Sequence, residues 1–164
     1  MQLLAKVLAP LLGLFILRVG NVFLSSLTTL RLDASGASAH MVGIVSSAYF
    51  IGLTIGALFH DRLIVRIGHI RAYSSFASLG VVSILMQALS ADWTVWILAR
   101  LVYGWTTVGI FLVIESWLLL AAAQTVRGRR LALYMLSFYG AGVLSQWLLG
   151  SVAGLGETAP FITS

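Results

Sequence analysis

Charged residues and cysteine are what this sequence has least of. Only 9% of its 164 residues are charged, and none is cysteine. A soluble domain carries roughly 25% charged residues, so this chain has too few to cover a surface that faces water. The lack of cysteine excludes disulfides and thiolate metal sites. What the chain does have is apolar surface, because 60% of its residues are hydrophobic. The composition therefore indicates an integral membrane protein whose first partner is the lipid bilayer.

Five apolar runs are long enough to cross a bilayer, which takes about 20 residues as a helix. They cover residues 7–30, 41–60, 72–90, 93–123 and 131–155. Each run predicts a helix, because it is longer and more continuously apolar than a barrel strand. The first run is also too long for a signal peptide, whose apolar region has about 7–15 residues. The predicted fold is an all-α membrane bundle in which short connections make consecutive helices antiparallel neighbours.

The positive charges predict how this bundle is oriented, because lysine and arginine are enriched in cytoplasmic loops. One side of the bundle carries Lys6, Arg62, Arg66, Arg71, Arg127, Arg129 and Arg130, and the other carries Arg31. We therefore expect a cytoplasmic N-terminus, a cytoplasmic basic hinge (residues 56–71) and a cytoplasmic loop at residues 127–130. A basic net charge can also indicate nucleic acid. These arginines lie in short turns between apolar runs, so no nucleic-acid partner is expected.

Polar side chains inside a span are costly, and each one needs a reason. In the first span Arg18, Asn21, Ser25 and Thr28 recur at helical spacing and share one face. Serine and threonine on such a face more often join helices by hydrogen bonds than form a site. Arg18 lies too deep to reach the surface easily. We expect it to face a water-filled cavity or an acidic partner.

Arg100 is the second arginine inside a span, and Gly104 and Thr107 lie on its face of the fourth helix. The glycine would let another helix or a substrate approach closely. A structural ion pair and a functional role both remain open for Arg100. Glu115 is the only acidic residue within a predicted span, and it lies about 22 Å further along the helix. Glu115 therefore cannot pair with Arg100, but it can reach the arginines of the basic hinge.

The fifth span has one polar face, on which Tyr139, Gly142 and Gln146 could line a cavity. Small residues at a spacing of four form two further pairs, Gly52 with Gly56 and Gly150 with Gly154. Such pairs indicate packing between helices more often than a binding site.

The histidines carry no recognisable chemistry. His40, His60 and His69 all lie at or near the ends of predicted segments, and they do not have the spacing of metal ligands. No metal site and no cofactor is expected. An intramembrane serine protease would need a serine and a histidine at depth, and no histidine is expected there, so the sequence does not indicate an enzyme.

The basic hinge carries a resemblance to a known family. Its residues Gly56, Asp61, Arg62, Arg66, Gly68 and Arg71 resemble the loop signature between helices 2 and 3 of the major facilitator superfamily. The sequence departs from that signature in three ways, one of which is that His69 stands in place of a basic residue. The Asp-Arg pair comes one residue late, with His60 in the usual acidic position, and the loop is longer before Gly68.

Two further motifs agree with this resemblance. Arg100 and Gly104 resemble the R-x-x-x-G motif of the family's helix 4. Glu115-Ser-Trp117, followed by Arg127-Gly-Arg129, resembles a bacterial branch of the family, the YcaD-like group. The three motifs occur in the family's order and extend the resemblance over nearly the whole chain.

The resemblance implies a fold of twelve helices in two halves, with the substrate bound between them. Residues 1–164 would supply five helices of the N-terminal half, so we expect an N-terminal fragment that lacks helix 6 and needs the missing C-terminal half. It implies a secondary active transporter of small solutes, with ion coupling, in a bacterial inner membrane. The expected cavity residues are Arg18, Asn21, Arg100, Thr107, Tyr139 and Gln146. The two arginines fit either an anionic solute or acidic partners in the missing half, with a slight preference for the partners.

The resemblance also implies that the hinge is a conformational latch. Asp61 would contact the other half, and Arg62 or Arg66 would pair with Glu115. Breaking such a latch lets the two halves rock against each other. One alternative from another class remains open, namely a complete small membrane protein that acts as a non-transporting scaffold or accessory subunit.

Overall fold

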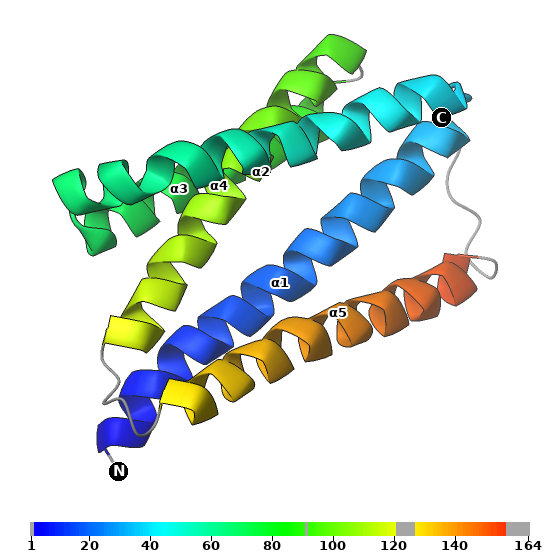
Figure 1. Ribbon diagram of the computed structural model, residues 1–164. Helices are drawn as coiled ribbons and strands as arrows, with labels where there is room; N and C mark the ends of the chain where they lie inside the picture. Colours follow the sequence, from blue (N-terminus) through cyan, green and yellow to red (C-terminus); the bar gives the residue numbers. More distant parts are fainter. Residues whose placement is uncertain (1, 91, 121–126, 157–164) are drawn as a thin grey trace. The chain divides into compact units, whose positions relative to one another are not determined.

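The computed structural model describes residues 2–90, 92–120 and 127–156. They form five α-helices and no strand (Figure 1). The helices are α1 (Gln2–Ala34), α2 (Ala39–Ile67), α3 (His69–Leu89), α4 (Trp93–Leu120) and α5 (Arg127–Gly156). Each contains a stretch that is long and apolar enough to cross a membrane. The predicted all-α membrane fold is confirmed, and the chain is a multi-pass membrane protein.

The links between the helices have identifiable local causes. Gly36, with a φ of 74°, turns the chain after α1. The Ser38 hydroxyl then accepts a hydrogen bond of 3.3 Å from the Met41 N–H and caps the start of α2. Between α3 and α4, the Asp92 carboxylate accepts a hydrogen bond of 2.8 Å from the Thr94 N–H. Side-chain oxygens at these positions satisfy amide groups that have no partner within the helix.

The basic hinge is not a loop, and the predicted end of the second span at residue 60 was wrong. Helix α2 continues through Asp61 and Arg62 to Ile67. It stops at Gly68, whose φ of 87° is strained for any residue with a side chain. The Gly68 N–H still bonds the Ile64 carbonyl at 2.9 Å, and α3 starts at the next residue. A charged side chain can extend into water while its backbone keeps its helical hydrogen bonds, so charge alone does not end a helix.

The predicted loop at residues 127–130 was also misplaced. Arg127, Arg129 and Arg130 lie in the first turn of α5. Their side chains, and residues 121–123 at the predicted end of the fourth span, fall outside the described residues.

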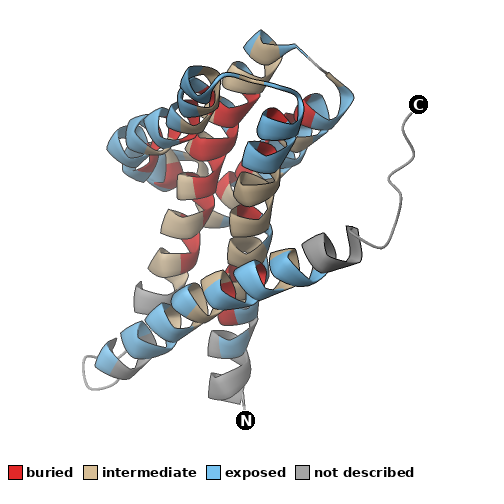
Figure 2. Ribbon diagram, turned by 90° about the vertical axis from the view of Figure 1, so that its right-hand side faces the viewer, coloured by how far each residue is buried: buried red, intermediate tan, exposed pale blue. Residues whose placement is uncertain are grey.

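The chain divides into two compact units, which we describe one at a time. The first contains residues 1–30 and 121–164, and its described helices are α5 and most of α1. The second contains residues 31–120, in which α2 and α3 both pack mainly against α4 and only lightly against each other. Helices α2 and α3 do touch, as predicted for consecutive helices, but their contact is much smaller than the one that each makes with α4. In Figure 2 the buried residues run along the faces where helices meet.

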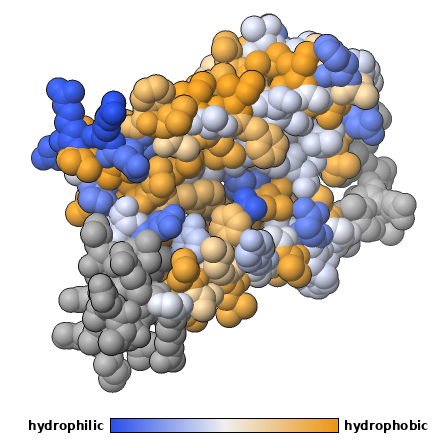
Figure 3. Space-filling model, in the orientation of Figure 1, coloured by the Kyte–Doolittle hydropathy of each residue, from blue (hydrophilic) through white to orange (hydrophobic). Residues whose placement is uncertain are grey.

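The outward faces of the helices are apolar, as lipid contact requires. Large side chains such as Phe50, Leu58 and Val65 are exposed. Figure 3 shows orange, hydrophobic surface along the helices and strongly hydrophilic side chains gathered where α2 ends and α3 begins. A soluble protein would not leave so many large apolar side chains exposed in contiguous stretches.

Candidate functional site

The centre of the second unit is a close crossing of α2 and α4 at two glycines. A methyl group built on Gly52 would overlap the Leu101 carbonyl oxygen of α4. A methyl group built on Gly104 would overlap the Tyr49 carbonyl oxygen of α2. Each glycine thus lies against the backbone of the opposite helix. The expectation that Gly52 belongs to a packing face is confirmed, and Gly104 admits a helix rather than a substrate.

This crossing brings Arg100 of α4 against an aromatic ring of α2. The guanidinium carbon of Arg100 lies 4.9 Å from the centre of the Tyr49 ring, and Arg100 is only 3% exposed. Such a contact attracts the cation to the face of the ring and fixes its position. Thr107 is buried too, and its hydroxyl donates to the Tyr103 carbonyl at 2.7 Å. Both predicted cavity residues therefore lie inside the packed unit, and their role in a cavity stays a prediction.

His60 lies in a buried aromatic cluster with Phe76 of α3 and Trp105 of α4. Its ring is fully buried, 4.4 Å from the Phe76 ring and 4.5 Å from the Trp105 ring. The placement of His60 at the end of a segment was wrong, because α2 continues past it. The Gly56 carbonyl interacts with the ring, yet neither ring nitrogen makes a hydrogen bond of acceptable geometry within the described residues.

This aromatic cluster also explains two small residues. A methyl group on Gly56 would come within 2.7 Å of the His60 ring, and one on Gly109 would come within 2.6 Å of the Phe76 ring. Sequence reasoning missed the cluster because it took residue 60 as the end of the span. The described residues contain no group of three histidine or acidic side chains that could hold a metal ion.

The predicted latch residues lie at the end of α2 and along α4. Asp61, Arg62 and Arg66 are exposed on the last turns of α2. Glu115 is half-buried on α4, two residues before Trp117, whose ring lies 5.7 Å from that of Tyr73 in α3. Within the residues the structure describes, Glu115 forms no ion pair. Its pairing with Arg62 or Arg66 therefore stays a prediction.

In the first unit Arg18 of α1 lies over the aromatic ring of Phe138 in α5. The guanidinium carbon of Arg18 lies 4.1 Å from the centre of the Phe138 ring. The buried Nε atom has no hydrogen-bond partner among the described residues. We expected a cavity or an acidic partner for Arg18, and the structure instead gives it an aromatic one. No sequence signal pairs these two residues, because they are far apart in the chain.

A second contact joins the same two helices. The Gln146 side-chain amide of α5 donates a hydrogen bond of 3.3 Å to the Ser26 hydroxyl of α1. The hydroxyl of Thr28 donates to the Leu24 carbonyl of its own helix at 2.7 Å, and the expectation that it joins two helices stays a prediction. Figure 1 shows α1 and α5 lying side by side. The interhelical hydrogen bond is thus one residue away from the predicted polar face.

The remaining predicted residues of this unit are divided between buried and open positions. Asn21 is 3% exposed, whereas Tyr139 is 68% exposed. Gly142 and Gly150 have no atom within 4 Å of a methyl group built on them, so Gly150 does not form the expected packing contact here. The surroundings of Gly154, the other member of the predicted pair, lie outside what the structure describes. Whether this face lines a cavity stays a prediction.

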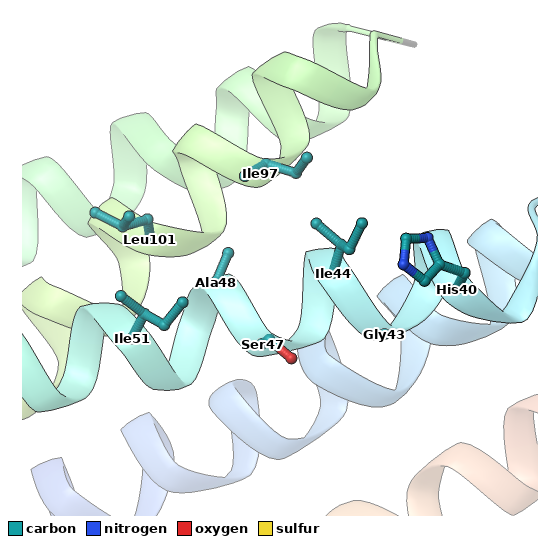
Figure 4. Close-up of a pocket in the computed structure, with 8 residues that line it drawn as sticks. All are labelled: His40, Gly43, Ile44, Ser47, Ala48, Ile51, Ile97 and Leu101. Carbon is teal, nitrogen blue, oxygen red and sulfur yellow. The ribbon is translucent and has the colours of Figure 1, made fainter.

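A groove of about 460 Å³ follows the first half of α2 where it passes α4 (Figure 4). Ile97 and Leu101 line it from α4, and the α2 residues around Ile44 and Ile51 line it from the other side. Its lining is almost entirely apolar, and none of the predicted cavity residues contributes to it. The groove therefore fits apolar contact rather than recognition of a polar solute.

Comparison with known proteins finds relatives among MFS-type transporters. An MFS-type transporter YcaD of Salmonella enteritidis is 34% identical over 161 residues, which is 96% of this chain and 41% of that protein. An MFS-type transporter of Yersinia pestis is 33% identical over 147 residues, which is 90% of this chain and 38% of that protein. The chain is a homologue of MFS-type transporters. No family model matches the sequence, and no solved structure matches it.

The homology to MFS-type transporters confirms the resemblance that the hinge, the Arg100 motif and the Glu115 motif indicated. The chain spans about two fifths of the length of these relatives. The similarity covers nearly all of this chain, so the five helices, the Gly52–Gly104 crossing and the two arginine–aromatic contacts all belong to a transporter-like sequence.

Proposed function

We propose that this chain forms part of a secondary active transporter of small solutes and acts together with a further helical segment. The observation that carries the proposal is the similarity to MFS-type transporters over 96% of the chain. The relatives are more than twice as long, and this supports the need for a further segment. The proposed location is a bacterial inner membrane. The N-terminus and the turn at Gly68 face the cytoplasm in this proposal, because Arg62, Arg66 and Arg71 gather at that turn.

Arg18 is the residue we propose to face the solute from the first unit. An ion pair would neutralise its charge, but the aromatic contact with Phe138 holds the side chain while leaving its charge in place. A positive charge in a span is costly unless something compensates for it when the site is empty. That compensation would come from an anionic solute or from a carboxylate of the further segment. Asn21, Tyr139 and Gln146 complete this proposed face.

Arg100 and Thr107 have a different proposed role in the second unit. Both are buried at the crossing of α2 and α4. We propose that they border the cavity only in a state in which that crossing has rearranged. In the state described here Arg100 rests on Tyr49 and supports the contact between the helices.

The end of α2 is the proposed latch. Asp61 would contact the further segment, and Arg62 or Arg66 would pair with Glu115 in one of the two states of the transporter. Gly68 directly precedes α3, and Arg71 lies in the first turn of that helix, so a shift of α2 would be transmitted directly to α3. Ion coupling, where it occurs, would need an acidic group from the further segment, because the acidic residues of the five apolar stretches (Asp33, Asp61 and Glu115) all lie toward the end of a stretch rather than at its middle.

The test compares the chain alone with a fusion that adds the part of the Salmonella relative beyond the matched residues. Both would be reconstituted into proteoliposomes and tested for counterflow of a panel of acids, sugars and drugs. We expect the fusion, but not the chain alone, to exchange at least one solute. Exchange by the chain alone would contradict the need for a further segment.

The residue assignments are tested in the same fusion. We expect Arg18→Ala and Arg100→Ala each to lower exchange at least tenfold, whereas Thr29→Ala, an exposed position on α1, leaves it unchanged. Equal exchange by all three variants would remove both arginines from the solute path. A correctly folded fusion that exchanges no solute on the panel would favour the alternative, namely a non-transporting scaffold or accessory subunit.

A further inference from the structure

A small pocket lies where the end of α1 meets the start of α4. We call it the tryptophan pocket, and it is lined by Arg31, Leu32, Ser35, Trp93 and Trp96. Its volume is about 270 Å³. All five residues belong to the second compact unit, so the pocket is described within one body. It shares no residue with the groove between α2 and α4 or with the proposed solute path.

Its walls are held in place by hydrogen bonds. The Trp96 indole N–H donates to the Ser90 carbonyl at 2.7 Å, which fixes the ring against the link before α4. The Ser35 hydroxyl donates to the Leu32 carbonyl at 2.7 Å. Leu32 itself is 1% exposed and forms an apolar floor. The pocket is therefore preformed, which lowers the entropic cost of binding.

Arg31 is the one cation among the residues that line this pocket. Two aspartates, Asp33 and Asp92, are close in the sequence to lining residues. Arg31 is exposed and makes no ion pair among the described residues. Asp33 is exposed two positions further on, a spacing at which helical side chains do not face each other. Asp92 directly precedes Trp93 and keeps one oxygen on the Thr94 N–H. Neither aspartate lines the pocket, so a ligand held by Arg31 would meet negative charge only with the part that extends beyond the pocket, which favours a zwitterion whose cation lies at its outer end.

The position of the pocket indicates a ligand from the membrane. The pocket joins the last turn of α1 to the first turn of α4, and α2 separates it by about 43 Å from the charged turn at Gly68. It therefore lies at one membrane surface, where tryptophan rings prefer to sit at the level of lipid headgroups.

From this geometry we propose that the tryptophan pocket binds the headgroup of a zwitterionic phospholipid that carries a primary ammonium, such as phosphatidylethanolamine. The phosphate accepts hydrogen bonds from the Arg31 guanidinium, whose fork of donors matches phosphate oxygens. The ammonium lies toward Asp33 or Asp92. Trp93 and Trp96 contact the glycerol and the first carbons of the chains.

The size of the pocket agrees with a headgroup rather than a whole ligand. Pockets that enclose drug-sized molecules have about 300–1,000 Å³. At about 270 Å³ this one holds only a small polar group and leaves the acyl chains outside, against the exposed apolar faces of the helices. A soluble phosphate compound would lose the contacts of those chains, so the lipid is the favoured source of the phosphate.

Native mass spectrometry of the 164-residue chain in detergent tests the proposal. Phosphatidylethanolamine, phosphatidylglycerol and phosphatidylcholine with matched chains would be titrated, and free phosphoethanolamine would be titrated in parallel. We expect phosphatidylethanolamine to bind most tightly. Arg31→Gln should weaken its binding roughly tenfold to a hundredfold, as the loss of a charged hydrogen bond implies. Arg71→Gln, which removes an exposed arginine of α3 near the charged turn, is the matched control and should leave binding unchanged.

A second variant keeps the test decisive. Asp33→Asn combined with Asp92→Asn should abolish the preference for phosphatidylethanolamine over phosphatidylglycerol, with helix content unchanged by circular dichroism. Equal lipid binding by Arg31→Gln and the unaltered chain would overturn the proposal. Tighter binding of phosphatidylglycerol, or equally tight binding of free phosphoethanolamine, would overturn the assignment of the headgroup or of its lipid source.

Discussion

Adding a single methyl group at Gly104 should separate α2 from α4. A methyl carbon there would overlap the Tyr49 carbonyl oxygen and lie 2.9 Å and 3.1 Å from the Tyr49 carbon and the Leu53 nitrogen. All three are backbone atoms, so no side chain can rotate away, and the helices must move apart by about 1 Å to restore normal contact. A gap of that size forfeits a quarter to a half of the dispersion energy of each contact it opens.

The expected cost of Gly104→Ala follows from these distances. Overpacking typically costs about 1–3 kcal/mol, and the better helix propensity of alanine returns up to about 1 kcal/mol. We therefore expect a net loss of about 2 kcal/mol in the free energy of unfolding, with loss of the contact between Arg100 and Tyr49. The assay is unfolding of the purified chain in mixed micelles of increasing denaturing detergent, followed by circular dichroism.

The matched control is Gly43→Ala on α2. A methyl group at Gly43 meets no atom within 4 Å, so the substitution should be neutral or stabilise the chain by up to about 1 kcal/mol. The double variant Gly52→Ala with Gly104→Ala should cost less than the sum of the single variants, because one methyl group already opens the crossing for the other. If Gly104→Ala unfolds at the same detergent fraction as Gly43→Ala, the close crossing is not present in solution.

Three further substitutions test the aromatic cluster and the α1–α5 contact by the same unfolding titration. Gly109→Ala should cost about 1 kcal/mol, less than Gly104→Ala, because the Phe76 ring it meets can shift; a cost above 3 kcal/mol would contradict this. His60→Phe should be neutral or stabilising, since it removes a buried ring nitrogen that lacks a hydrogen bond, and a large loss would reveal a partner for His60. Gln146→Ala should cost at most about 1 kcal/mol, because its hydrogen bond to Ser26 is long and exposed, and a larger loss would show that this contact holds α5 to α1.

The helices were predictable because their cause is local. A span needs only a long apolar run, and among the described residues each of the five runs lies in a helix, although α2 extends to Ile67. The clearest failure was at residue 60, where charge was taken as the end of a helix. The backbone signal was Gly68, whose positive φ ends α2.

The contacts of the candidate site were less predictable because they depend on packing between distant segments. The sequence marked Arg18 and Arg100 as unusual, but it could not show that Phe138 and Tyr49 would lie against them. It also marked Gly52 and Gly104 separately. Only the packing of α2 on α4 reveals that each glycine faces the backbone of the other's helix.

The crossing at Gly52 and Gly104 has a genetic consequence. A bulky side chain in a protein core can usually be tolerated when the residue opposite it becomes smaller. Here the atoms opposite each glycine are main-chain atoms, which no mutation can shrink. Second-site suppressors of Gly104→Ala should therefore be absent from the crossing itself. They should arise further along α2 and α4, where smaller or larger side chains can tilt one helix over the other.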